Sequence, residues 1–285
     1  MDIRRPLRAL AAARRAPRVS VLRLYGPIGL PGRMSSSLSD AGLAEPIEAA
    51  FAAKPAAVAL AINSPGGSPV QSALIAARIR RLAEAKKVPV YAFCEDVAAS
   101  GGYWLACAGD EIWADASSVL GSIGVISAGF GFQDAIGRIG VERRVHTAGT
   151  RKMMLDPFQP EKDEDVERLL SLQSEIHDAF AGHVRARRGS KLADQDLFTG
   201  EFWTGARAVE LGLADGLGHL RAVMEGKLGE KARFREFGAK RSFAQRFGLS
   251  GGGAGANAPA GLAAEAAHAA VEALETRAAW SRFGA

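Results

Sequence analysis

The chain has 285 residues, of which 48% are hydrophobic and 24% charged, as in an ordinary folded soluble domain. Its formal charge of +5 does not indicate a nucleic-acid partner, because residues 1–18 hold six arginines against one acid and the rest is close to neutral. Two cysteines, Cys94 and Cys107, are too few for a disulfide framework and lack metal-ligand spacing. We therefore expect a reducing compartment, no bound metal and no cofactor.

The first 18 residues form a basic N-terminal arm that we expect to be solvated and loosely attracted to anionic membrane surfaces. Arginines interrupt its Leu-Ala stretch, so it lacks the apolar core of a signal peptide. No window of about 18 uninterrupted apolar residues predicts a transmembrane helix. The expected location is the cytoplasm, with peripheral contact to the inner membrane as an option.

Strands, turns and helices alternate along the centre of the chain, which predicts an α/β architecture with mainly parallel strands. The predicted strands cover residues 19–28, 57–62, 89–93, 112–114 and 120–126. Helices are predicted at 69–86, 100–109, 161–188 and 204–211. Apolar residues at three- and four-residue intervals make the helix at 161–188 amphipathic, and we expect it at the surface.

The composition changes near residue 238, where the main folded domain at 19–238 is predicted to end. Residues 239–285 begin with a glycine-rich linker and continue into an alanine-rich helix predicted at 261–280. We expect this appended segment to dock on a neighbouring copy of the chain.

Two glycine-rich turns could bind an anion. Asn63-Ser64-Pro65-Gly66-Gly67 follows one predicted strand, and Ala99-Ser100-Gly101-Gly102 leads into a helix. Glycine lets the backbone approach a ligand closely, and free N–H groups at a helix start attract negative charge. Side by side, such turns would form an oxyanion hole; each alone could also be a plain strand–helix connection.

Ser100 and Lys152 are the candidate catalytic pair, because a serine hydroxyl needs a neighbouring base and an uncharged lysine amine can serve as one. Residues 98–102 read Ala-Ala-Ser-Gly-Gly, which differs from the Gly-x-Ser-x-Gly elbow. His146, near Lys152, is the rival base, whereas His177 falls on the predicted surface helix. A lysine base must be neutral, so we expect the methionines after Lys152 to help bury it.

Several ordered motifs resemble those of the signal peptide peptidase A family. They are Asp96-Val-Ala-Ala-Ser-Gly-Gly-Tyr103, the preceding Asn63-Ser-Pro-Gly-Gly67, Gly121-Ser-Ile-Gly-Val125, Lys152 before a proline, and Ala206 to Asp215 with its Gly-Leu-Ala-Asp end. The match spans roughly residues 18–225. The resemblance implies a Clp-protease/crotonase-like fold with repeated ββα units and flanking helices.

The resemblance also implies a role for each candidate residue. Ser100 would be the nucleophile, Lys152 the general base, and Ser122 the group that orients the lysine amine. Backbone N–H groups of the two turns would form the oxyanion hole, namely those of Gly67 and Gly101, with Gly66 as their neighbour. The implied activity is a serine endopeptidase that cleaves signal peptides or other unstructured polypeptides.

In this family the dyad is completed between neighbouring domains, so a single-domain chain is expected to form a homo-oligomeric ring, with an octamer favoured. The arginine-rich arm stands where relatives commonly carry a membrane anchor. Two other readings remain open. A crotonase-like acyl-CoA enzyme would need neither Ser100 nor Lys152, and a non-catalytic scaffold or membrane-associated chaperone would show no peptide hydrolysis.

Overall fold

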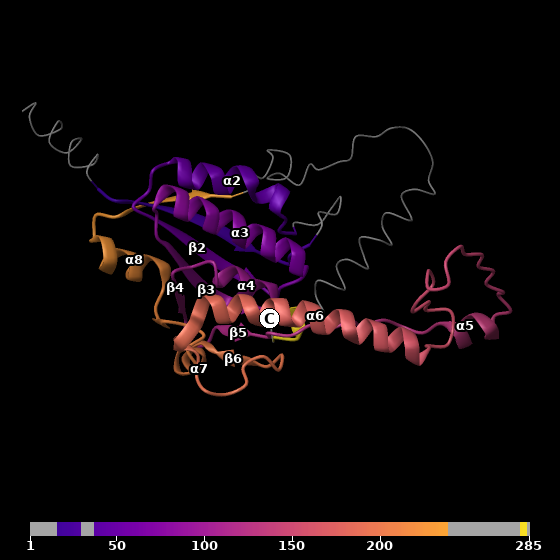
Figure 1. Cartoon of the computed structure of the whole chain (residues 1–285). Coiled ribbons are helices and arrows are strands. Elements are labelled where there is room, and N and C mark those ends of the chain that lie inside the picture. The colour runs from indigo at the N-terminus through magenta and orange to yellow at the C-terminus, as the bar shows by residue number, and fades with distance from the viewer. Residues whose placement is uncertain (1–15, 30–36, 239–279, 284–285) are drawn as a thin grey trace, which may run out of the picture.

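A computed structural model describes residues 16–29, 37–238 and 280–283 (Figure 1). In this part of the chain an eight-stranded sheet has the order β6-β5-β3-β2-β1-β8, with β4 pairing β3 and β7. Its pairs are parallel apart from the antiparallel pair β5 and β6. The strands are β1 (Arg18–Tyr25), β2 (Ala57–Ser64), β3 (Val90–Ala99), β4 (Glu111–Ala114), β5 (Val119–Gly121), β6 (Phe202–Thr204), β7 (Gly216–Leu217) and β8 (Arg233–Phe237).

Helices cover both faces of the sheet. One apolar cluster joins it to α2, α3, α4, α6 and α7, and a smaller cluster joins it to α8 on the other face. The helices are α2 (Asp40–Ala52), α3 (Pro69–Lys86), α4 (Gly101–Ala106), α5 (Gln133–Arg138), α6 (Asp163–Arg188), α7 (Gly205–Glu210) and α8 (Leu220–Leu228), with a 3-10 turn at Gly189–Lys191. The predicted α/β class is confirmed.

Strand β2 shows why this sheet is buried on both sides. Its larger side chains and its alanines alternate, and successive side chains of a strand point to opposite faces. Val58, Leu60 and Ile62 belong to the larger cluster, and Ala57, Ala59 and Ala61 to the smaller one, against Met224 of α8. Small residues on the second face let α8 pack closely.

Helix α3 matches the prediction to the residue. The Ser68 hydroxyl accepts a hydrogen bond from the Gln71 N–H at 3.4 Å, and Pro69 occupies the first turn. Lys87 ends the helix in the left-handed conformation, with φ 53°. A capping serine followed by proline is a strong start signal.

The predicted strand at 120–126 is wrong in its length. β5 ends at Gly121, because Ser122 turns into the left-handed region with φ 51°. The Ser122 N–H donates to the Glu201 carbonyl at 2.6 Å. The chain then leaves the sheet.

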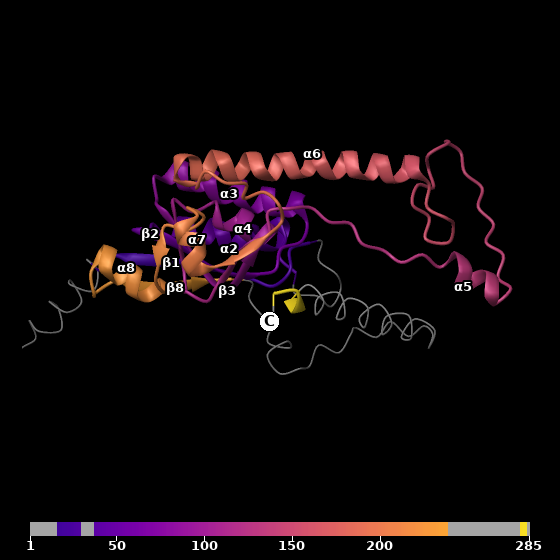
Figure 2. The ribbon, with the colours of Figure 1, turned by 90° about the horizontal axis from the view of Figure 1, so that it is seen from below.

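Residues 125–160, which we call the α5 projection, extend away from the sheet alongside the first half of α6 (Figures 1 and 2). The projection carries large exposed apolar side chains, among them Phe130 (80% exposed) and Ile139 (74% exposed). Exposed apolar surface of this kind is typical of a contact surface for another chain.

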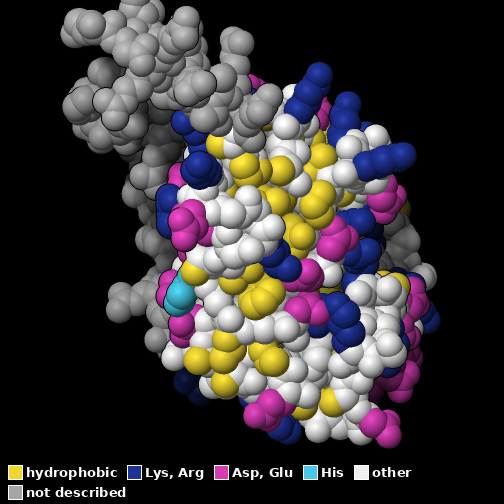
Figure 3. Space-filling model, turned by 90° about the vertical axis from the view of Figure 1, so that its left-hand side faces the viewer, with side chains coloured by type: hydrophobic (Ala, Val, Ile, Leu, Met, Phe, Trp, Pro, Cys, Tyr) yellow, Lys and Arg dark blue, Asp and Glu magenta, His cyan; other side chains and the backbone are white. Residues whose placement is uncertain are grey.

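The side of the molecule opposite the projection carries charges of both signs around patches of hydrophobic side chains (Figure 3). Ion pairs join neighbouring elements: Lys227 of α8 pairs with Glu111 of β4 at 2.8 Å, and Arg23 of β1 with Glu236 of β8 at 2.6 Å. No described helix is long and apolar enough to cross a bilayer. The expected basic arm, apart from residues 16–18, and the predicted helix at 261–280, apart from its last residue, lie outside the described residues.

Candidate active site

The turn after β2 is held against the end of β3. The Asn63 amide donates to Asp96 at 2.6 Å and accepts from the Val97 N–H at 3.2 Å. The register between the two strands shifts between Ile62 and Ser64. Because parallel strands end at the same edge of a sheet, both glycine-rich turns meet there.

Ser100 lies between β3 and α4 in a sparsely populated backbone conformation, with φ 52° and ψ −121°. Its N–H donates to the Gly121 carbonyl at 2.8 Å, while its hydroxyl caps no N–H of α4. Non-glycine residues with positive φ are uncommon and cluster at functional sites. The sequence departs from the Gly-x-Ser-x-Gly pattern, yet the nucleophile candidate sits on a similarly sharp strand-to-helix turn.

The two turns touch so closely that glycine is required. A Cβ on Gly66 would lie 2.7 Å from the Ser100 Cβ, and one on Gly67 would lie 1.9 Å from the Ile28 carbonyl oxygen. A Cβ on Gly101 would lie 3.3 Å from the Gly67 nitrogen. The backbone of both turns therefore lies within contact distance of the serine.

Two N–H groups at this junction have no hydrogen bond among the described residues: those of Gly67 and Gly101. The Gly66 N–H is engaged, because it donates to the Ser64 hydroxyl at 3.2 Å. Of the three glycines predicted for an oxyanion hole, two thus offer free donors. Such donors stabilise a developing oxyanion without reorganisation.

We expect Gly67→Ala to lower both stability and any acyl-transfer activity, because its φ is +142° and the added Cβ meets the Ile28 carbonyl. Displacing one oxyanion donor costs about 10²–10³ in kcat. The control is Gly226→Ala in α8, where nothing lies within 4 Å of the added Cβ and helix propensity improves. Thermal unfolding and hydrolysis assays should show a lower melting temperature and a lower rate for Gly67→Ala but not for Gly226→Ala. Equal melting temperatures and rates for the two variants would contradict this prediction.

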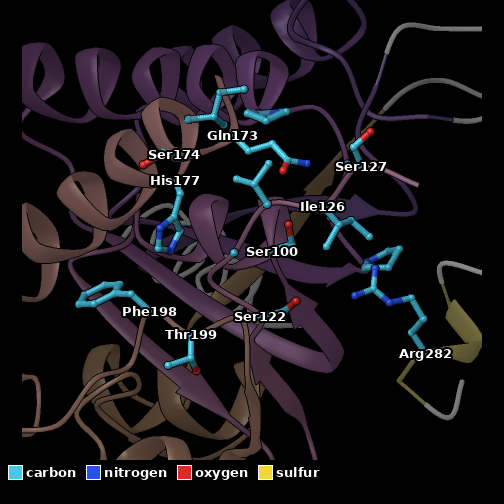
Figure 4. A pocket seen from close by; sticks show the side chains of 18 of the residues that line it. Ser100, Ser122, Ile126, Ser127, Gln173, Ser174, His177, Phe198, Thr199 and Arg282 are labelled. Carbon is cyan, nitrogen blue, oxygen red and sulfur yellow. The ribbon is translucent and has the colours of Figure 1, made fainter. Parts of the chain in front are cut away.

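A cavity of about 1130 Å³ opens above Ser100. Ser100 and Ser122 both line it, and their side chains lie near its floor (Figure 4). One wall comes from α6, through Leu169, Leu170, Leu172, Gln173, Ser174, Ile176 and His177. Arg282 lies at the opposite side (Figure 4). Phe283 also lines the cavity, and its ring contacts that of Phe202 at 5.3 Å between centroids.

Helix α6 lies at the surface, as predicted, although it begins at Asp163 and not at residue 161. Its buried residues are confined to the last third: Phe180, Ala181, Val184 and Arg188. Leu170 is 57% exposed and faces the cavity instead of a core. The periodic apolar pattern therefore covers a cavity wall as well as a packed face.

Lys152 lies on the α5 projection, where its side chain is exposed, and it does not line the cavity around Ser100. Its N–H donates to the Gly149 carbonyl at 3.3 Å. Met153, expected to help bury it, is 36% exposed. Asp156 is engaged elsewhere, with Arg143 at 3.1 Å. A single chain does not bring Lys152 to Ser100.

His177 lies on the predicted surface helix, but sequence reasoning missed its place at the candidate site. It lines the cavity (Figure 4), and its Nε2 is buried without a hydrogen-bond partner among the described residues. His146, the predicted rival base, is exposed on the projection. The sequence signal that could have placed His177 at the cavity is its spacing of seven residues from Leu170, which puts both side chains on one face of α6.

No group of three or more His, Cys, Asp or Glu residues in the described ranges is arranged to hold a metal ion. A family comparison gives the decisive observation: the sequence model of "Peptidase family S49" matches residues 82–232. The chain belongs to peptidase family S49. The matched range contains both Ser100 and Lys152.

Similar proteins are longer than this chain and carry different names. A Brucella abortus protein named Na(+)/H(+) antiporter NhaA is 51% identical over 271 residues, which is 93% of this chain and 37% of that protein. A putative signal peptide peptidase SppA of Enterococcus faecium is 32% identical over 61% of this chain and 51% of its own length. The chain thus spans about a third to a half of these relatives.

The fold is also that of a solved peptidase. The 1510-N membrane-bound stomatin-specific protease, in a variant bound to a substrate peptide, covers 82% of this chain and 97% of its own, with a TM-score of 0.51 and 14% identity. At this identity the likeness concerns the fold alone. The Clp-protease/crotonase-like α/β fold expected from the sequence is confirmed.

Proposed function

We propose that this protein is a serine endopeptidase in which Ser100 is the nucleophile. The observation that carries this is the position of Ser100, which lines the large cavity and whose hydroxyl caps no N–H of α4. Beside it lie the N–H groups of Gly67 and Gly101, which have no hydrogen bond among the described residues. Membership of peptidase family S49 supports it. An oxyanion held by Gly67 and Gly101 would form as Ser100 attacks a peptide carbonyl.

Lys152 of a neighbouring copy would be the general base. Its exposure on a projecting, partly apolar segment supports a role across an interface, because the amine needs burial to be neutral. The amine would take the Ser100 proton and give it to the leaving amine, after which water would release the acyl group. Ser122, which is 7% exposed beside Ser100, would orient that amine.

Head-to-tail contacts of this kind close into rings when the rotation permits, so the proposal includes a homo-oligomeric ring. The expected substrates are unstructured polypeptides, signal peptides among them. A cavity of about 1130 Å³ with an apolar α6 wall fits an extended peptide segment better than a folded surface.

A fluorophosphonate probe tests the nucleophile directly, because it reacts covalently with activated serines. We expect mass spectrometry to find the label on Ser100 and to find none on the Ser100→Ala protein, with parallel loss of peptide hydrolysis. Ser117→Ala, an exposed serine of another loop, is the control and should remain labelled. An unlabelled, inactive wild-type ring would favour a crotonase-like enzyme or a scaffold.

A further inference from the structure

A second, much smaller cavity adjoins the large one at the nucleophile. Its volume is about 20 Å³. Ser100 borders it together with Gly67 and Gly101, whose N–H groups have no hydrogen bond within the described part of the chain. The remaining walls come from Pro69, Trp104, Gly124, Val125, Ile176 and Phe180.

The position of this cavity identifies the substrate group that it would receive. In acyl transfer the carbonyl carbon touches the nucleophile and its oxygen points to the oxyanion donors. The side chain of the same residue is one carbon away, on Cα. It must therefore enter a space bordered by both the serine and the donor glycines, as this cavity is.

Rigid aromatic packing limits the depth of the cavity. The Trp104 ring stacks on Phe180 at 4.9 Å and 22°, and on His183 at 4.8 Å and 15°. Trp104 and Phe180 are 8% and 4% exposed, and the backbone N–H of Trp104 donates to the Ser100 carbonyl at 3.0 Å. Close-packed side chains of this kind yield little to a larger group.

A volume of about 20 Å³ holds roughly one water-sized group, which is close to a methyl or hydroxymethyl and well below an isobutyl or benzyl group. Resting on the proposed peptidase function, we propose that the enzyme cleaves after small residues, chiefly alanine, glycine and serine. Trp104, Ile176 and Phe180 set the size limit.

Peptidyl-aminocoumarin substrates that differ only in the residue before the coumarin test this. With wild-type protein we expect kcat/KM for alanine to exceed that for leucine and phenylalanine by about 10- to 200-fold, the range that pocket fit provides. Leucine or phenylalanine substrates cleaved as fast as alanine would overturn the size limit and leave the peptidase proposal standing. No cleavage of any substrate would overturn both.

Ile176→Ala provides the matched variant, because Ile176 is 38% exposed and its loss should spare the core. We expect it to raise the leucine-to-alanine ratio of kcat/KM about tenfold. Leu170→Ala trims the same helix but borders only the large cavity, so its ratio should equal that of wild type. The ratio is insensitive to a general loss of activity. Equal ratios in both variants would remove Ile176 from the specificity pocket.

Discussion

Cells that co-express Ser100→Ala and Lys152→Ala chains are expected to yield active particles, although each variant alone should lose at least about 10⁴-fold in kcat. Lys152 is exposed on the α5 projection and absent from the cavity of its own chain. A site built from two copies needs Ser100 from one and Lys152 from the next. In a randomly mixed ring, about a quarter of the sites would hold both intact residues.

Differently tagged variants, purified over both tags, supply the mixed particles for a peptide hydrolysis assay. Arg151→Ala, the adjacent exposed cation, is the control and should keep wild-type activity. Activity of the Ser100→Ala chain alone would exclude Ser100 as nucleophile. Mixed particles as inactive as their parents would exclude a base supplied by a second copy.

Asp215→Ala is expected to destabilise the folded chain by about 3 kcal/mol, because it leaves a buried cation unpaired. The Arg188 guanidinium donates to Asp215 at 2.7 Å and to the Gly212 carbonyl at 2.7 and 2.9 Å. Arg188 is 4% exposed. Asp215 also accepts from the Ile112 N–H at 2.7 Å and pairs with Lys191 at 2.6 Å.

This cluster ties the end of α6 to β4 and α7, so its loss should also loosen the cavity wall. Urea unfolding measures the change in free energy, and the exposed pair of Arg207 and Glu210 is the control. Glu210→Ala should cost under about 1 kcal/mol. An equal cost for both variants would mean that burial of Arg188 adds nothing to the pair.

The same cluster predicts a pH dependence with a definite sign. Burial by itself raises the pKa of Asp215, but hydrogen bonds from Arg188 and Lys191 outweigh it and hold the pKa below the usual 3.8. A carboxyl with a depressed pKa stabilises the fold above its unfolded-state value and loses that contribution as pH falls through the folded-state value. Stability should therefore fall below about pH 4, and Asp215→Asn should flatten that part of the curve.

Elements with local signals were predictable from the sequence. Helix α3 could be placed because Ser68 and Pro69 mark its start, and β2 because its apolar run is continuous. Helix α2 was missed because proline, normally a breaker, lies inside it at Pro46. Strand β8 was missed because its alternation of charged and aromatic residues is completed only by pairing with β1.

The close contact between the two glycine-rich turns was predictable, but the surroundings of the candidate site were not. Glycines at 66, 67 and 101 indicated close backbone contacts, which the turns display. Periodicity alone could not separate a helix face that packs on a core from one that borders a cavity, so His177 was assigned to a plain surface. The family resemblance implied a dyad completed between neighbouring domains, but no local pattern around Lys152 indicated that it lies outside the cavity of its own chain, since the exposure of a loop depends on everything around it.

The positive φ of Ser100 restricts which amino acids can occupy the position of the proposed nucleophile. Threonine carries the same hydroxyl, but branching at Cβ is poorly tolerated in this region of backbone space. The backbone conformation therefore favours a side chain that is unbranched at Cβ, whatever its reactivity. The hydroxyl at this position is accordingly the primary alcohol of serine.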